Sequence, residues 1–311
     1  MSIARAAEVL SAGGLVVFPT ETVYGLGGDA TNPKAVARIF AAKGRPRFNP
    51  LISHVLGLSE AEQHARLHPT ARALADRFWP GPLTIVAPRR PDSTVAELAC
   101  AGLATIALRA PAHPVARELL AAFGKPIVAP SANRSGHVSA TTAQHAVEDL
   151  GASVDFVLDA GRSPIGLEST IVAIDDAGRA TLLRVGAVSR AEIEASTGPL
   201  EAPQPNAVAA PGMLESHYAP RARLRLDAEA PRASEAYLAF GSDAPTGGLT
   251  LSASGDLVEA AANLYAHLRA LDAAGAQTIA VAPIPAQGLG EAIRDRLARA
   301  AAPRERIANR E

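Results

Sequence analysis

A proline-rich stretch between Gly198 and Pro220 most constrains how this chain can fold. Proline fixes φ and removes a backbone donor, so a run of prolines interrupts any regular helix or strand. At 311 residues the chain also exceeds the usual size of one hydrophobic core. We therefore expect a large domain over 1–198, a linker over 199–221 and a smaller domain over 222–311. The prolines that define the linker are Pro199, Pro203, Pro205, Pro211 and Pro220.

Short apolar runs alternate with amphipathic segments on both sides of this linker, which favours an α/β or α+β fold. Helices are expected in the N-terminal segment and at 33–42, 69–79, 114–123, 141–150, after Ser189, at 257–271 and at 290–301. Strands are expected at 15–18, 51–55, within 80–88, and at 105–108, 127–129, 156–158, 170–174, 181–183, 224–226, 237–240 and 278–281. The last three strands alternate with helices in a Rossmann-like order.

Two helices carry a predicted capping box, in which Ser or Thr precedes Glu or Gln by three residues. Thr141 with Gln144 is expected to start one, and Ser189 with Glu192 the other. The glycines of YGLGG, residues 24–28, are expected to form a turn that permits close approach of the backbone to a ligand. A tight turn without a ligand would look the same.

Composition excludes several functions. The net charge is −1 and no block of five or more basic residues occurs, which argues against tight binding to nucleic acid or to an anionic membrane. The single cysteine, Cys100, rules out an intrachain disulfide framework and a multi-cysteine zinc site. No signal-peptide pattern and no run of about 18 apolar residues is present, so we expect a cytoplasmic protein.

A cluster of cations follows the helix predicted at 33–42. Lys43, Arg45 and Arg47 are spaced two apart in KGRPRFNP. Alternate residues of an extended segment point the same way, so the three side chains could converge on a polyanion. Cations are also favoured at a helix C-terminus. The segment is therefore either a phosphate site or a solvated helix end.

Polar residues follow several of the predicted strands, where ligands bind in open α/β sheets. PTET offers Thr20, Glu21 and Thr22, and Arg109 ends another strand, where it could clamp a carboxylate. His54 lies within a strand and is either a ligand contact or a core histidine. Other polar residues lie after a strand, namely Ser131, Asn133, Ser135 and Ser139 in PSANRSGHVS, or at the start of one, namely Glu168, Ser169 and Thr170 in GLEST.

No motif for covalent catalysis accompanies these residues. The PSAN segment itself contains no histidine or acid to activate its serine, so it suits ligand binding or a polar loop. The P-loop, zinc-protease, nucleophile-elbow and kinase signatures are also missing. Any nucleotide must therefore be held by an unusual set of contacts.

Together these segments resemble the threonylcarbamoyl-AMP synthase family, whose catalytic domain has the YrdC-like fold. The resemblance implies a twisted mixed sheet flanked by helices, followed by the smaller Rossmann-like α/β domain of the longer members. Val185 replaces a proline common in the family, and Ala210 stands where a serine often precedes PGM. The matching segments are FPTETVYGLG (18–27), KGRPRFNPL (43–51), WPGPLT (79–84), TIALRAPAHP (105–114), APSAN (129–133), GLESTI (166–171), LLRVG (182–186), PGMLESHYAP (211–220) and GLGEAIRDRLARA (288–300).

The resemblance implies a nucleotidyltransferase that condenses L-threonine, bicarbonate and ATP into threonylcarbamoyl-AMP and pyrophosphate. A tRNA threonylcarbamoyltransferase machinery would then move the product to adenosine 37 of tRNA, and contact of this chain with tRNA itself would be weak at most. Mg²⁺ would bind through the ATP phosphates, without a direct protein ligand.

Roles carry over from the family residue by residue. Lys43 and Arg45 would be catalytic, and the linker residues His217 and Tyr218 would close over the nucleotide. Threonine would contact Thr20, His54, Arg109, Ala129 and Ser169. ATP would contact Lys43, Arg45, Arg47, Thr105, Ser131, Asn133, Ser139, Arg184, His217 and Tyr218.

Two other functions are compatible with a YrdC-like fold. An RNA-binding or ribosome-maturation module is one, although the near-neutral charge and the lack of an aromatic and basic RNA motif oppose it. A carbamoyl-transfer domain of the hydrogenase-maturation type is the other. That type would bring acylphosphatase and zinc-finger segments, and this chain has one cysteine.

Overall fold

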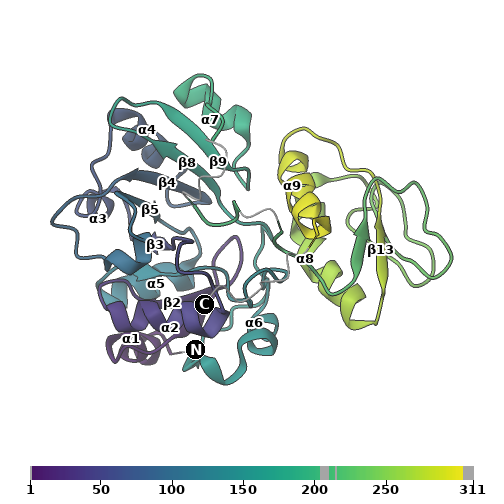
Figure 1. Ribbon diagram of the computed structural model, residues 1–311, viewed down its shortest axis with the longest axis horizontal. Coiled ribbons are helices and arrows are strands. Elements are labelled where there is room, and N and C mark those ends of the chain that lie inside the picture. Colours follow the sequence, from purple (N-terminus) through teal and green to yellow (C-terminus); the bar gives the residue numbers. More distant parts are fainter. Residues whose placement is uncertain (1, 204–209, 214–215, 304–311) are drawn as a thin grey trace. The chain divides into compact units, whose positions relative to one another are not determined.

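The computed structural model describes residues 2–203, 210–213 and 216–303, and the linker residue Pro205 lies outside them (Figure 1). The chain divides into two units. Unit 1 contains residues 1–135 and 139–213, and unit 2 contains residues 136–138 and 214–311. The short segment Gly136–Val138 therefore belongs to unit 2, although its chain neighbours belong to unit 1.

Unit 1 is built on a mixed sheet of nine strands in the order β7-β1-β2-β6-β3-β5-β4-β8-β9. The sheet contains both parallel and antiparallel pairs: β3 runs parallel to β5, for example, and β4 antiparallel to β5. This is the mixed α/β sheet that the sequence predicts. The strands are β1 (Val16–Phe18), β2 (Gly25–Asp29), β3 (Ile52–His54), β4 (Leu83–Pro88), β5 (Thr105–Arg109), β6 (Ile127–Val128), β7 (Phe156–Val157), β8 (Thr170–Ile174) and β9 (Ala180–Arg184).

Helices cover both faces of this sheet. α1 and α5 pack on the face that carries Phe18 and Ile127, and α2, α4, α6 and α7 contribute to the larger core on the opposite face. The short helices α3, η1 and η2 were not predicted. The helices are α1 (Ile3–Ser11), α2 (Pro33–Lys43), α3 (Leu58–Ala61), α4 (Pro69–Phe78), η1 (Glu97–Cys100), α5 (Pro114–Phe123), α6 (Ala143–Leu150), η2 (Gly151–Ser153) and α7 (Arg190–Thr197).

The predicted glycine turn is instead strand β2, so that prediction was wrong. β2 pairs antiparallel with β1, and the ring of Phe18 on β1 lies over it. A Cβ atom at Gly27 would approach Phe18 Cε1 to 2.8 Å, and one at Gly25 would approach the Ala129 side chain to 3.1 Å. The glycines are therefore needed for close packing against a neighbouring strand.

The start of α6 also differs from the prediction by one residue. Thr142, and not Thr141, is the N-cap, and its hydroxyl accepts from the backbone N–H of His145. The side chain of Gln144 bonds to Glu148 instead of closing a capping box. Two adjacent threonines offer equivalent caps, so the pattern alone could not choose. The capping box of Ser189 with Glu192 at α7 is confirmed.

In the part that the structure describes, unit 2 is a small sheet of four parallel strands in the order β10-β13-β11-β12, with two helices. The parallel strands and the helix between β12 and β13 agree with the Rossmann-like order predicted. The elements are β10 (Arg223–Arg225), β11 (Ala236–Ala239), β12 (Leu249–Thr250), α8 (Leu257–Ala273), β13 (Thr278–Val281) and α9 (Leu289–Ala301). β12 was not predicted, because a two-residue strand leaves no periodic pattern.

The packing of Phe18 over β2 gives a test of the corrected strand. Replacing Gly27 by Ala should lower the free energy of unfolding by about 1–3 kcal/mol, because the added methyl group has no room. Gly57→Ala is the control, since nothing lies within 4 Å of a Cβ there. Urea denaturation of both variants would compare them, and equal stability would contradict the packing argument.

Candidate functional site

One face of the unit 1 sheet brings together most of the residues predicted to bind threonine. His54 on β3 lies opposite Arg109 on β5, and Thr84 on β4 bonds to Ser169, which precedes β8. Thr20 follows β1, whose Phe18 ring packs edge-on against the His54 ring. Ala129 follows β6, and its N–H donates to the carbonyl of Ile52 beside His54. Register thus gathers distant motifs on one sheet face.

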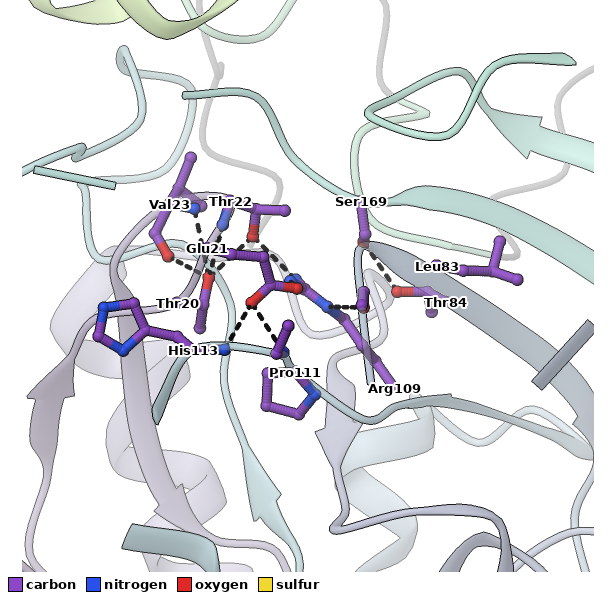
Figure 2. Close-up of polar contacts among 12 residues, drawn as sticks. Thr20, Glu21, Thr22, Val23, Leu83, Thr84, Arg109, Pro111, His113 and Ser169 are labelled. Atoms are coloured by element: carbon purple, nitrogen blue, oxygen red, sulfur yellow. Dashed lines mark hydrogen bonds and ion pairs between the residues drawn. The ribbon is translucent and has the colours of Figure 1, made fainter. Parts of the chain in front are cut away.

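A buried ion pair joins two of these motifs. Arg109 Nη2 donates to Glu21 Oε1 at 2.5 Å, and both side chains are more than nine-tenths buried. The other Glu21 oxygen accepts from the backbone N–H groups of Ala112 and His113, at the start of α5 (Figure 2). The pair therefore links the turn after β1 to the end of β5 and to the segment that follows it.

A chain of hydrogen bonds runs from Arg109 into the PTET turn (Figure 2). Arg109 Nη1 donates to the Thr22 hydroxyl at 2.9 Å, and the Thr22 and Thr20 hydroxyls are 2.8 Å apart. The Thr20 hydroxyl donates to the carbonyl of Val23 at 2.7 Å. The Val23 carbonyl can only accept, so it takes the single proton of the Thr20 hydroxyl, and Thr22 must then donate to Thr20. With Arg109, which can only donate, the proton order is Arg109 to Thr22, Thr22 to Thr20, and Thr20 to Val23.

Charge keeps Glu21 ionised despite its burial. Burial alone would raise the pKa of Glu21, but the charge of Arg109 and the hydrogen bonds to the carboxylate outweigh it, and the pKa lies below its usual value. Both oxygens of the carboxylate are thus paired, which offsets part of the desolvation cost of burying the charge.

His54 is uncharged in this environment. Burial and the nearby charge of Arg109 lower its pKa to about 3, although Glu21 and two backbone carbonyls act in the opposite direction. Its Nδ1 atom is buried without a hydrogen-bond partner among the described residues. Buried polar atoms are usually paired, so an unpaired nitrogen on this face marks a place where a ligand could bind.

The uncharged state of His54 predicts how stability depends on pH. The unfolded chain binds a proton at His54 below pH about 6.5 and the folded chain does not until pH about 3. Stability from this group is therefore lost as pH falls from 6.5 to 3, by about 1.4 kcal/mol per pH unit. In His54→Gln the dependence of the free energy of unfolding on pH should be weaker by about 1.4 kcal/mol per pH unit over this range.

Denaturation of the wild type and of His54→Gln at several pH values between 3 and 6.5 measures the difference. His64 and His113 also have lowered pKa values, and they contribute equally to both proteins. A free-energy difference that does not change with pH would contradict the buried, neutral histidine.

Arg184 on β9 reaches the same face. Its Nε donates to the Ser169 carbonyl at 3.0 Å and its Nη2 to the Ser169 hydroxyl at 3.1 Å, while Nη1 donates to the carbonyl of Pro211. Ser139 donates to the carboxylate of Glu168, the residue before Ser169. Ser139 and Arg184, which were predicted to bind the nucleotide, therefore contact the GLEST segment. Ser169, which was predicted to bind threonine, lies in the same segment.

Lys43 lies in the last turn of α2, and its ammonium group donates to the backbone carbonyls of Ser131 and Asn133. Burial and the charge of Arg45 hold the pKa of Lys43 well below its usual value. Arg45 is also buried and donates to the carbonyls of Asn49 and Pro50 and to the Asn49 side chain. Lys43 is therefore joined directly to the PSAN segment.

The three cations do not extend from one straight segment, so the expected alternation was wrong. Lys43 is helical, Gly44 adopts a left-handed conformation with φ of 60°, and Arg47 lies in a turn and is exposed. Only Lys43 and Arg45 are buried together.

Thr105 lies at the far end of β5 from Arg109, about 13 Å away along the strand.

His217 and Tyr218 belong to unit 2, where both are buried. The Tyr218 ring stacks on Tyr265 of α8 with 5.8 Å between centroids, and the Arg296 guanidinium of α9 lies 5.0 Å from its centre. The His217 N–H donates to the Arg299 carbonyl in the last turn of α9. Leu214 and Glu215 of the same motif lie outside the described residues.

Sequence reasoning missed some contacts of the site. Glu21 and Thr22 were noted in the turn, and Thr84 lies in the matching segment WPGPLT, but none of the three received a role. The signal for Thr84 is a single hydroxyl within the apolar run LTIVAP, which is too common to interpret. For Glu21 the signal is stronger, since an acid beside a buried strand needs a cation.

The described residues contain no group of three or more His, Cys, Asp or Glu side chains that could hold a metal ion. Within the same ranges, no helix has the length and apolar character that crossing a membrane requires.

Comparison with known proteins defines the class first. Residues 8–186 match the Sua5/YciO/YrdC family model, described as telomere recombination, and residues 188–302 match the C-terminal domain of threonylcarbamoyl-AMP synthase. These matches define a YrdC-like nucleotidyltransferase with an added C-terminal domain. The chain belongs to the threonylcarbamoyl-AMP synthase family.

Individual relatives agree over nearly the full length. The threonylcarbamoyl-AMP synthase of Bacillus subtilis is 38% identical, over 96% of this chain and 92% of the relative. The crystal structure of Pyrococcus abyssi Sua5 complexed with L-threonine has a TM-score of 0.88 and 37% identity, and covers 96% of this chain and 94% of that one. A full-length HypF structure shares only the fold, with a TM-score of 0.53 and 19% identity over 60% of this chain and 30% of that one.

Proposed function

We propose that this chain condenses L-threonine, bicarbonate and ATP into threonylcarbamoyl-AMP and pyrophosphate. The observation that carries the proposal is the similarity, over nearly the whole chain, to proteins named threonylcarbamoyl-AMP synthase, together with the polar face of unit 1. The threonine amine would take up the carbon of bicarbonate with loss of water. An oxygen of the resulting carbamate would attack the α-phosphorus of ATP, and pyrophosphate would leave.

The threonine site is proposed on the face around Arg109. Thr20, His54, Arg109, Ala129 and Ser169 line it, as the family resemblance implies. The neutral His54 can donate or accept a hydrogen bond, and its unpaired nitrogen supports a ligand at this position. A site that pairs the threonine hydroxyl would discriminate against analogues that lack it.

The nucleotide site is proposed around Lys43 and the PSAN segment. Lys43 is held by the two carbonyls at Ser131 and Asn133, and its pKa is lowered by burial. The charge of ATP phosphates would favour the protonated ammonium and so raise that pKa. Arg45, Arg47, Thr105, Ser139 and Arg184 are the other proposed ATP contacts in unit 1, and His217 and Tyr218 are those in unit 2.

We propose that the residues position the reactants and stabilise charge, without a covalent intermediate. Mg²⁺ would arrive with the ATP phosphates and share their charge. The product would pass to a tRNA threonylcarbamoyltransferase machinery, and we propose a cytoplasmic location.

Pyrophosphate release by the purified chain tests the reaction. Release should require ATP, L-threonine and bicarbonate together, because the carbamate that attacks the α-phosphorus forms only when the last two are present. The three omission experiments are the controls. Release that continues without threonine or bicarbonate would refute the synthase.

Lys43 gives a second test. Lys43→Ala should lower kcat by about 100-fold or more, because a preorganised charge at a reacting phosphate is lost. Lys34→Ala on the same helix is the matched control, since Lys34 is exposed. Pyrophosphate release and circular dichroism of both variants would separate catalysis from folding. Equal rates in the two variants would remove Lys43 from the mechanism.

A further inference from the structure

We propose that Glu21 is a positioning residue and an internal counter-ion of the threonine site. It fixes Arg109 and the PTET turn, and it keeps Arg109 from capturing the small anions of the reaction mixture in place of threonine. This inference rests on the proposed function.

The carboxylate of Glu21 accepts three hydrogen bonds inside the protein. One oxygen accepts from Arg109 and the other from two backbone N–H groups, those of Ala112 and His113 (Figure 2). Only 7% of the residue is exposed. A carboxylate with three donors and almost no solvent contact holds its position, so it is suited to orient its partners and not to react.

Arg109 is oriented through this carboxylate. Its Nε donates to the Gly81 carbonyl at 3.2 Å, its Nη1 to Thr22 and its Nη2 to Glu21. Three of the five N–H groups of this arginine therefore have acceptors among the described residues, and the other two could bind a ligand. The orientation of the guanidinium then determines the direction in which the Thr22 and Thr20 hydroxyl groups point, because these groups are joined to it by successive hydrogen bonds.

The charge of Arg109 needs an internal partner for a second reason. Bicarbonate, ATP and pyrophosphate are all anions, and a buried arginine without a counter-ion would attract each of them. When Glu21 neutralises Arg109 within the protein, Arg109 no longer attracts every anion by its charge. Threonine is then recognised by directed hydrogen bonds. Selectivity often depends on weakening the binding of competing ligands as well as on favouring the correct one.

The variant Glu21→Gln removes the charge and keeps the shape. One amide oxygen cannot replace two carboxylate oxygens, so either Arg109 or the two backbone N–H groups would lose their acceptor. The KM for threonine should rise about 10-fold, equivalent to about 1.4 kcal/mol, while the KM for ATP stays within about 2-fold. Sulfate should become a competitive inhibitor against threonine, with an inhibition constant about 10-fold lower than in the wild type.

Asp29→Asn is the matched control, because Asp29 is an equally buried carboxylate, 4% exposed, at the end of β2. It should leave both KM values and the sulfate inhibition unchanged. Glu21→Asp separates charge from geometry: the retained charge should prevent sulfate inhibition, although the shorter side chain weakens threonine binding. This variant also serves if Glu21→Gln does not fold.

Several results would overturn the inference. One is an equal loss of affinity for threonine and ATP in Glu21→Gln, which would indicate a general structural role. Another is sulfate inhibition that is unchanged in Glu21→Gln, or equally strengthened in Glu21→Asp. Binding of threonine and of sulfate to the chain without ATP, measured by calorimetry, tests the counter-ion role without turnover. If the wild type fails to release pyrophosphate, the proposed function fails, but the calorimetric comparison still decides the role of Glu21.

Discussion

The buried ion pair between Glu21 and Arg109 holds together segments that are far apart in the chain. Through its hydrogen bonds it connects the turn after β1, the end of β5, the turn before β4 at Gly81 and the start of α5. A buried pair of this kind contributes little net stability unless every remaining donor and acceptor is satisfied. Here both carboxylate oxygens have donors and three of the Arg109 N–H groups have acceptors, so the pair holds these segments in a defined geometry.

The polar cluster can exist at this place because the rest of the sheet is apolar. Most of the sheet and its covering helices form continuous hydrophobic clusters, and Ile52, Val86, Ala107 and Ile171 form one on the same face as the site. These apolar neighbours exclude water and lower the local dielectric. They therefore strengthen the charge–charge interaction of Arg109 with Glu21 and also keep His54 neutral.

The sequence predicted most helices and strands, because apolar periodicity and proline or glycine breaks are local signals. It failed at β2, where glycine usually indicates a turn but here accommodates the ring of Phe18 from a neighbouring strand. It also failed for the three cations, because the left-handed conformation of Gly44 separates Lys43 from Arg47. For the site, Arg109 was predicted from its place at a strand end and from the family resemblance, but its partners depend on rotamers and sheet register, which no local pattern encodes.

The assignment of Gly136–Val138 to unit 2 has a consequence for how the chain can be divided. Because these three residues are flanked by unit 1, the polypeptide passes between the units three times, near residues 135, 138 and 213. In unit 2 they are held by Ala219, whose N–H donates to Gly136, and by Arg269 of α8, which donates to Val138. Each unit is thus built from two segments of the chain, and cleavage at a single peptide bond cannot separate the two units completely. Insertions or deletions near Gly136 should therefore disturb the packing of both units.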